Sequence, residues 1–258
     1  MPGKDWNPAL YARFKGLRLR PALDLIQRIG PLPRGDVIDL GCGTGSVGAA
    51  LGTAFPDRPL RGVDASPAML EKARATGHYA DLSQADIADW APDAPPALIF
   101  SNAALHWLPD HATLLPRLAR TLAPGGTLAV QMPRQTGAPS HRFLRDISMH
   151  LFGDRFDFAD WTPPVAPAEA YWRMLSPLGE VQAWETEYIQ HLAPSPDGHP
   201  VRRFTESTAM RPFLDKLTPA ERDIFITAYE QALSVAYPRL DDGGALFPFR
   251  RCFFLLTL

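Results

Sequence analysis

The sequence has 258 residues, of which 46% are hydrophobic and 21% are charged, a composition typical of an ordinary globular protein. Its length suits one large α/β domain or a domain with a substantial insertion. The formal net charge of −2 argues against a nucleic-acid-binding protein, which would normally carry an excess of basic residues.

The two cysteines, Cys42 and Cys252, have neither the spacing of a metal site nor that of a disulfide framework. The N-terminus has no apolar signal segment, and the longest apolar run is far too short to span a bilayer. We therefore expect a cytoplasmic protein that binds no metal, membrane or nucleic acid. The sequence leaves the oligomeric state open, with a monomer as our expectation.

Along the chain, a helix is predicted first over residues 5–29, because apolar residues from Leu19 to Ile29 recur at helical spacing. Short apolar runs then alternate with helical stretches. The runs suit buried parallel strands, at residues 37–40, 60–63, 97–100 and 127–131. The helical stretches cover residues 46–54, 67–75 and 110–122, the second with Ser66 as its N-cap. This alternation predicts a doubly wound parallel sheet.

After residue 132 the pattern changes. Residues 155–177 lack clean periodicity, 181–189 suit a strand, 199–237 suit helices with a capping box at Thr218, and 249–256 suit a final strand. We expect four parts: an N-terminal helical flap at residues 1–30, an α/β core at 31–135, a mostly helical cap with one strand at 136–245, and a final strand returning to the core sheet at 246–258.

A glycine-rich turn follows the first predicted strand and has two interpretations. Residues 43–48 fit the G-x-G-x-x-G fingerprint of dinucleotide-binding proteins. Residues 41–45, preceded by Asp39, instead fit the turn that binds S-adenosylmethionine. In either case backbone N–H groups and a helix N-terminus approach a ligand closely. The turn alone does not separate the two cofactors.

Polar residues at successive strand ends favour S-adenosylmethionine. Asp39 before the turn would repel a pyrophosphate but balances the cationic amino-acid end of S-adenosylmethionine. Asp64 suits the ribose hydroxyls of either cofactor, and Asp86 with Ile87 suits an adenine ring. The segment at residues 101–107 follows the fourth strand and is expected beside the methyl group. A nicotinamide oxidoreductase is therefore disfavoured.

The chain resembles the class I S-adenosylmethionine-dependent methyltransferases over residues 37–131, and over nearly its whole length it resembles the trans-aconitate 2-methyltransferase family. The segments that carry the narrower resemblance are Trp6-Asn7-Pro8 with Tyr11 and Phe14, residues 18–21, 101–111, 128–133, 211–214 and 249–253. The resemblance implies a mostly parallel, seven-stranded Rossmann-like sheet. It also implies methyl transfer to one carboxylate of trans-aconitate, giving a monomethyl ester and S-adenosylhomocysteine.

The resemblance and the strand-end pattern together suggest the site residues. The cofactor residues are Arg20, Asp39, Gly41, Cys42, Gly43, Gly45, Asp64, Ala65, Met69, Asp86, Ile87, Asn102 and Ala103. The substrate residues are Trp6, Tyr11, His106, Trp107, Arg211 and Arg251. The family commonly carries glutamine at the position of His106, so no acid–base role is expected for this histidine.

The expected chemistry needs no general base, because a carboxyl group with a pKa near 4 is already ionised at neutral pH. It needs alignment, removal of water and cations for the acceptor, and arginine binds carboxylates bidentately. Arg20, Arg211, Arg250 and Arg251 are the candidates, with Arg20 alternatively binding the cofactor carboxylate. Two alternatives remain open: another small or carrier-bound acid as acceptor, and a non-catalytic protein that binds S-adenosylmethionine.

Overall fold

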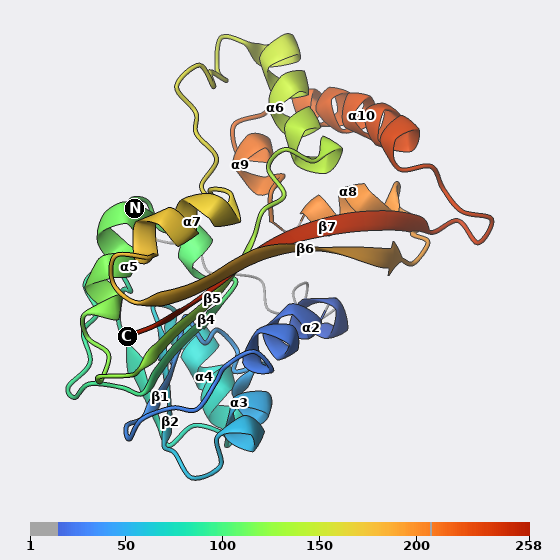
Figure 1. The fold of residues 1–258 in the computed structure, drawn as a ribbon. Helices are drawn as coiled ribbons and strands as arrows, with labels where there is room; N and C mark the ends of the chain where they lie inside the picture. The colour runs from blue at the N-terminus through green and yellow to red at the C-terminus, as the bar shows by residue number, and fades with distance from the viewer. Residues whose placement is uncertain (1–14, 207) are drawn as a thin grey trace. The chain divides into compact units, whose positions relative to one another are not determined.

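A computed structural model describes residues 15–206 and 208–258, with side chains from residue 19 onward (Figure 1). Its described strands form one seven-stranded sheet in the order β3-β2-β1-β4-β5-β7-β6. The strands are β1 (Val37–Leu40), β2 (Leu60–Asp64), β3 (Asp81–Gln84), β4 (Leu98–Asn102), β5 (Thr127–Pro133), β6 (Glu180–Leu192) and β7 (Ala245–Thr257). The first five pair in parallel and β7 runs antiparallel to β5. This confirms the predicted doubly wound, mostly parallel sheet.

The described residues form two compact units. The first contains residues 15–133, 164–186 and 251–258, and the second contains residues 134–163, 187–206 and 208–250. Both long strands, β6 and β7, contribute residues to each unit. This partition differs from the expected cap at 136–245, because residues 164–186 cluster with the sheet.

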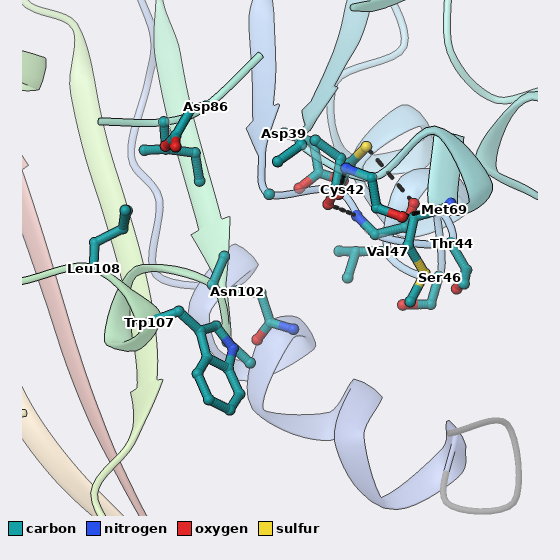
Figure 2. Close-up of a pocket in the computed structure, with 18 of the residues that line it drawn as sticks. Asp39, Cys42, Thr44, Ser46, Val47, Met69, Asp86, Asn102, Trp107 and Leu108 are labelled. Carbon is teal, nitrogen blue, oxygen red and sulfur yellow. Dashed lines mark hydrogen bonds between the residues drawn. The ribbon is translucent and has the colours of Figure 1, made fainter. Parts of the chain in front are cut away.

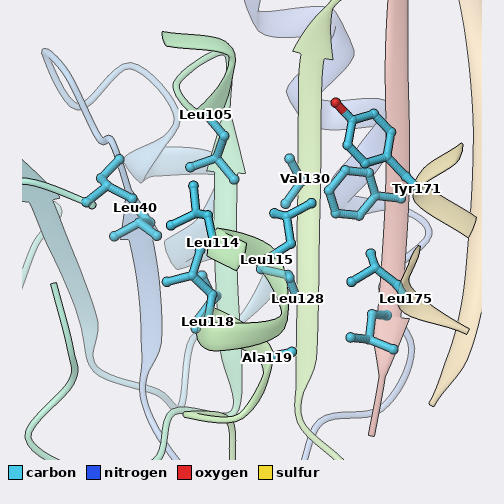
Figure 3. Packing of buried hydrophobic residues seen from close by; sticks show 14 of the residues in the cluster. Leu40, Leu105, Leu114, Leu115, Leu118, Ala119, Leu128, Val130, Tyr171 and Leu175 are labelled. Carbon is cyan, nitrogen blue, oxygen red and sulfur yellow. The ribbon is translucent and has the colours of Figure 1, made fainter. Parts of the chain in front are cut away.

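The first unit packs helices against the sheet. Its described helices are α2 (Lys15–Ile26), α3 (Gly48–Ala54), α4 (Pro67–Ala75), the short 3-10 helix η1 (Leu105–Trp107), α5 (His111–Ala119) and α7 (Ala168–Leu175). Apolar side chains of α5 and α7 bury in one cluster over the sheet (Figure 3), with the Tyr171 ring stacked on Phe254 of β7. They are Leu114, Leu115, Leu118, Tyr171 and Leu175. Tyr171 and Leu175 are fully buried there, which explains why α7 belongs to this unit. In α2, which ends the predicted flap, Ala22 and Leu25 are also fully buried.

The second unit contains α6 (Pro139–Phe152), α8 (Pro200–Glu206), α9 (Arg211–Leu214) and α10 (Pro219–Ala236). Helix α10 contacts α6 and α8 and buries Phe225, Tyr229 and Leu233 completely. The predicted capping box at Thr218 is confirmed, because its side chain and that of Glu221 each bind the other residue's backbone N–H. In the described part of the chain, no helix is long and apolar enough to cross a membrane.

Local sequence signals place several boundaries closely. Ser66 caps α4 by accepting a hydrogen bond from the Met69 N–H, as predicted. The two-turn helix α7 gave no periodic signal, because it buries only Tyr171 and Leu175 fully and starts just after Pro167.

Candidate active site

A cavity of about 580 Å³ lies at the carboxyl ends of β1, β2 and β4, where the strand order reverses (Figure 2). In open α/β sheets this switch point is the usual position of a ligand. All predicted cofactor residues except Arg20 and Gly45 line the cavity. They are Asp39, Gly41, Cys42, Gly43, Asp64, Ala65, Met69, Asp86, Ile87, Asn102 and Ala103. Trp107, predicted to contact the acceptor, also lines it and is 59% exposed.

The glycine turn after β1 is held by its own backbone hydrogen bonds. The Gly41 N–H donates to the Val63 carbonyl at 2.8 Å, and the Gly43 N–H donates to the Asp64 carboxylate at 2.8 Å. Gly41 has a φ of +79°, and an added Cβ would collide with Ala104, so only glycine fits there. Because the Gly43 N–H already has an acceptor, this first glycine of the dinucleotide fingerprint does not offer its N–H to a pyrophosphate.

Asp39 lies within β1, one residue before its end, and is buried, with 2% of its surface accessible. Its carboxylate accepts a hydrogen bond of 2.7 Å from the Tyr79 hydroxyl. Burial raises the pKa of Asp39 to about 7; the Tyr79 hydrogen bond opposes this rise and the charge of Asp64 adds to it. The carboxylate therefore titrates close to neutral pH in the protein alone.

Asp64 and Asp86 both line the cavity, but among the described residues only the Asp64 carboxylate accepts a hydrogen bond from a backbone N–H group beyond its own turn. Asp64 accepts from the Gly43 N–H with one oxygen and from the Ser66 N–H, at 2.9 Å, with the other. This fixes the carboxylate at the end of β2. Asp86 is exposed after β3, beside the buried side chain of Ile87. A polar group next to an apolar surface suits a flat, heteroaromatic ring.

Buried polar groups gather at the ends of β4 and β5. Asn102 and Gln131 are partners in the parallel register, and Arg251 of β7 donates to the Gln131 Oε1 at 3.1 Å. Gln131 is fully buried and Arg251 is 4% exposed. The buried atoms that have no hydrogen-bond partner among the described residues include Asn102 Oδ1, His106 Nδ1 and Gln131 Nε2. Such groups are rare in folded proteins and commonly await a ligand or water.

His106 lies in this polar group and is uncharged. Burial lowers the pKa of His106 to about 3, and the neighbouring Arg251 and His111 lower it further. Its ring is tilted against the Trp107 ring, with 4.5 Å between centroids. His106 is therefore a neutral hydrogen-bonding group at neutral pH, and the cation beside it is Arg251.

Several predicted residues do not line the cavity, namely Arg20, Gly45, His106 and Arg251. Arg20 is exposed on α2 and does not line the cavity. Gly45 has a φ of +74° and faces Ala73 and the Tyr79 ring. Trp6 and Tyr11 lie outside the described residues, so their assignment stays a prediction.

Two predicted arginines belong to the second unit. Arg211 begins α9 and is half-buried, and its role stays a prediction. Arg250 is 3.6 Å from the Glu187 carboxylate, so a nearby acid already balances its charge. Arg251, the next residue along β7, belongs to the first unit with Gln131 and His106.

Sequence reasoning missed Tyr79 and Gln131. Tyr79 lies between α4 and an exposed edge strand, where an aromatic residue gives no periodic signal. Gln131 stands at the carboxyl end of a buried strand, at the same edge as the predicted acids. A polar residue at the carboxyl end of a buried strand could have identified Gln131 as a candidate site residue.

Comparisons with known proteins agree with this geometry. Residues 37–126 match the model of the methyltransferase domain family. The chain is 45% identical to a trans-aconitate 2-methyltransferase of Methylobacterium radiotolerans, and the match covers 96% of each chain. It is 44% identical to the Acidovorax ebreus protein of the same name, again over 96% of each.

Solved structures show the same fold at low sequence identity. The YcgJ protein of Bacillus subtilis superposes with a TM-score of 0.58 at 17% identity, covering 92% of this chain and 98% of that one. A phosphoethanolamine N-methyltransferase of Haemonchus contortus, solved with S-adenosylhomocysteine, superposes with a TM-score of 0.53 at 19% identity, covering 92% and 52%. Given the identity and coverage of the curated relatives, the chain belongs to the trans-aconitate 2-methyltransferase family of S-adenosylmethionine-dependent methyltransferases.

Proposed function

We propose that this enzyme methylates one carboxylate of trans-aconitate or a similar small polycarboxylic acid, forming a monomethyl ester. The names of its relatives support the acceptor class. The observation that carries the proposal is the buried Arg251–Gln131 pair, which stands beside buried polar atoms that have no partner in the described structure.

The cavity residues fit S-adenosylmethionine by their chemistry. Asp39, Asp64 and Asp86 line the cavity and are acceptors, which suit an ammonium, ribose hydroxyls and an adenine amino group. Ile87, which is buried beside Asp86, provides an apolar surface for the adenine ring. An added Cβ on Gly43 would meet no atom within 4 Å, so the turn leaves open space there. Three carboxylates would repel the pyrophosphate of a dinucleotide.

When bound, S-adenosylmethionine supplies an electrophilic methyl group to the acceptor oxygen. The chain's own task is to bind and orient the acceptor. Arg251 pairs with an acceptor carboxylate, since an unpaired charge in a buried site is costly. Gln131 holds the guanidinium through Oε1 and offers its Nε2 hydrogens to the same carboxylate. Because the acid is already ionised, no side chain has to remove a proton.

Water must be kept from the reacting atoms, and Trp107 is placed for this task. Its ring lines the cavity beside Asn102, and both lie on the η1 side of the site in Figure 2. With 59% of its surface exposed, the indole can cover a bound acceptor. His106 tilts against it and adds a neutral polar edge.

The test is transfer of a labelled methyl group from S-adenosylmethionine to a panel containing trans-aconitate, cis-aconitate, citrate, succinate and a malonyl-carrier protein. We expect a base-labile methyl ester on trans-aconitate, with weaker transfer to acids that lack its geometry. Efficient transfer to the carrier and none to aconitate would contradict the proposed acceptor. Binding of the cofactor without transfer to any member would indicate a non-catalytic protein.

A further inference from the structure

We propose that Tyr79 is a positioning residue for the cofactor: its hydroxyl fixes the Asp39 carboxylate and thereby sets the affinity for the amino-acid end of S-adenosylmethionine. This inference rests on the proposed use of the cavity as the cofactor site. Tyr79 itself does not line the cavity, so it acts through Asp39. The hydrogen bond is 2.7 Å long and joins residues that are forty positions apart in the chain.

The Tyr79 ring lies in a space that three glycines leave open. An added Cβ would come within 2.9 Å of the ring at Gly45, 2.8 Å at Gly48 and 3.0 Å at Gly62. These glycines come from the turn, the start of α3 and the middle of β2. Three separate segments are therefore built around one aromatic ring, and the ring is fixed by packing as well as by its hydroxyl.

This packing also explains the misleading tail of the dinucleotide fingerprint. Gly45 and Gly48 occupy its second and third glycine positions, but each faces the Tyr79 ring. Neither glycine belongs to the cavity wall. The fingerprint spacing thus serves to admit a tyrosine, whose hydroxyl reaches the acid at the end of β1.

The groups around Asp39 make this hydroxyl important. The neighbouring Asp64 is an acid and opposes ionisation of Asp39, as does burial. The Cys42 thiol and the Tyr79 phenol both have raised pKa values, so both are neutral at physiological pH. The Tyr79 hydrogen bond is the influence that favours the charged carboxylate, and it lowers the pKa of Asp39. Removing the hydroxyl should therefore leave more of the carboxyl protonated near pH 7 and unable to pair with an ammonium.

The test is calorimetric binding of S-adenosylhomocysteine at pH 6, 7 and 8. We expect Tyr79→Phe to bind about tenfold more weakly at pH 7, the loss expected for a hydrogen bond to a charged group. The loss should be larger at pH 6 and smaller at pH 8, because higher pH restores the carboxylate. A ring that served only for packing would give no such dependence, since phenylalanine preserves the ring.

Three further single variants and one double variant separate the role of the hydroxyl from that of packing. Asp39→Asn should weaken binding and make it independent of pH over this range, and adding Tyr79→Phe to it should cost less than about twofold more. Gly48→Ala retains the hydroxyl but crowds the ring, so it should reproduce the loss although alanine favours helix α3. Tyr229→Phe, which removes a buried hydroxyl in the second unit, is the matched control and should leave affinity unchanged.

The outcomes separate this inference from the proposed function. If Tyr79→Phe binds like the wild type at all three pH values, the positioning role is wrong while the cofactor site stands. If the wild-type protein does not bind S-adenosylhomocysteine at all, both are wrong. Equal weakening at every pH by Tyr79→Phe would also contradict the role, because the loss would then not act through the ionisation of Asp39.

Discussion

At the ends of β1 and β2, the carboxylates already hold hydrogen bonds, whereas at the ends of β4 and β5 some buried polar atoms have no hydrogen-bond partner among the described residues. Asp64 accepts two backbone N–H groups and Asp39 accepts the Tyr79 hydroxyl. By contrast, Gln131 Nε2 and Asn102 Oδ1 are buried without a partner in the described structure. The first region is pre-organised before a ligand arrives, and we propose that the acceptor supplies the missing partners of the second.

The two regions also differ in charge. The first is acidic and suits the cationic end of the cofactor. The second carries Arg251 and a neutral His106, which suit an anionic acceptor. Methyl transfer from a cationic sulfonium to an anion needs both kinds of surface close together.

The largest effect is expected for Arg251→Gln. Loss of a buried cation that pairs with the acceptor should lower kcat/KM for trans-aconitate by about 10²- to 10³-fold, in line with about 2–5 kcal/mol for such pairs. The affinity for S-adenosylhomocysteine should stay within a few-fold of the wild type. Arg173→Gln, at an exposed position on α7, is the matched control and should leave both quantities unchanged. Comparable losses in both ligands would mean that Arg251 supports the fold and not the acceptor.

Asp39 should make the empty protein less stable as the pH rises. Its pKa is raised from 3.8 to about 7, so the folded protein favours the neutral form. The stabilisation is complete below pH 4 and is lost as the pH rises through 7. We expect the free energy of unfolding to fall by about 2–4 kcal/mol between pH 4.5 and 7.5, beyond the change shown by Asp39→Asn. Chemical denaturation at both pH values measures this, and identical pH profiles for the two proteins would contradict it.

A smaller effect is expected for Gln131→Leu. This change leaves Arg251 without its Oε1 partner and removes the Nε2 donor, so the KM for the acceptor should rise about tenfold. Gln131→Glu is the sharper variant, because a carboxylate of nearly the same shape would neutralise Arg251 and repel the acceptor. It should be at least as damaging as leucine in steady-state assays. An active Gln131→Glu enzyme would show that the pair does not bind the acceptor.

The smallest effect is expected for His106→Gln. Because burial and Arg251 lower the pKa of His106 to about 3, the imidazole is neutral throughout the working range, and a neutral amide should replace it within a few-fold in kcat/KM. The pH–rate profile between pH 6 and 9 should keep its shape. Loss of a titration in that range on substitution would instead assign His106 an acid–base role.

The sequence alone predicted the acidic residues of the cavity, because they stand in regular order at the ends of the strands. Asp39, Asp64 and Asp86 follow successive parallel strands, and parallel strands bring such ends to one edge. Tyr79 escaped because its position between a helix and an exposed strand has no periodic signature, and its contact spans distant segments. The partnerless state of Gln131 Nε2 could not be predicted either, because it depends on the packing of β4, β5 and β7.

The boundaries of helices and of the two units also show that only local interactions could be predicted from the sequence. The capping residues Ser66 and Thr218 could be predicted from the sequence because capping is a local interaction. The assignment of residues 164–186 to the sheet unit depends on where Tyr171 and Leu175 bury their side chains, and no local pattern encodes that destination.

The most direct test of the contrast between the two regions is a crystal structure with S-adenosylhomocysteine and trans-aconitate bound together. We predict that the amino group of the cofactor product contacts the Asp39 carboxylate, and that an aconitate carboxylate contacts the Arg251 guanidinium and Gln131 Nε2. Aconitate bound elsewhere, with Arg251 still contacting only protein groups, would contradict the account.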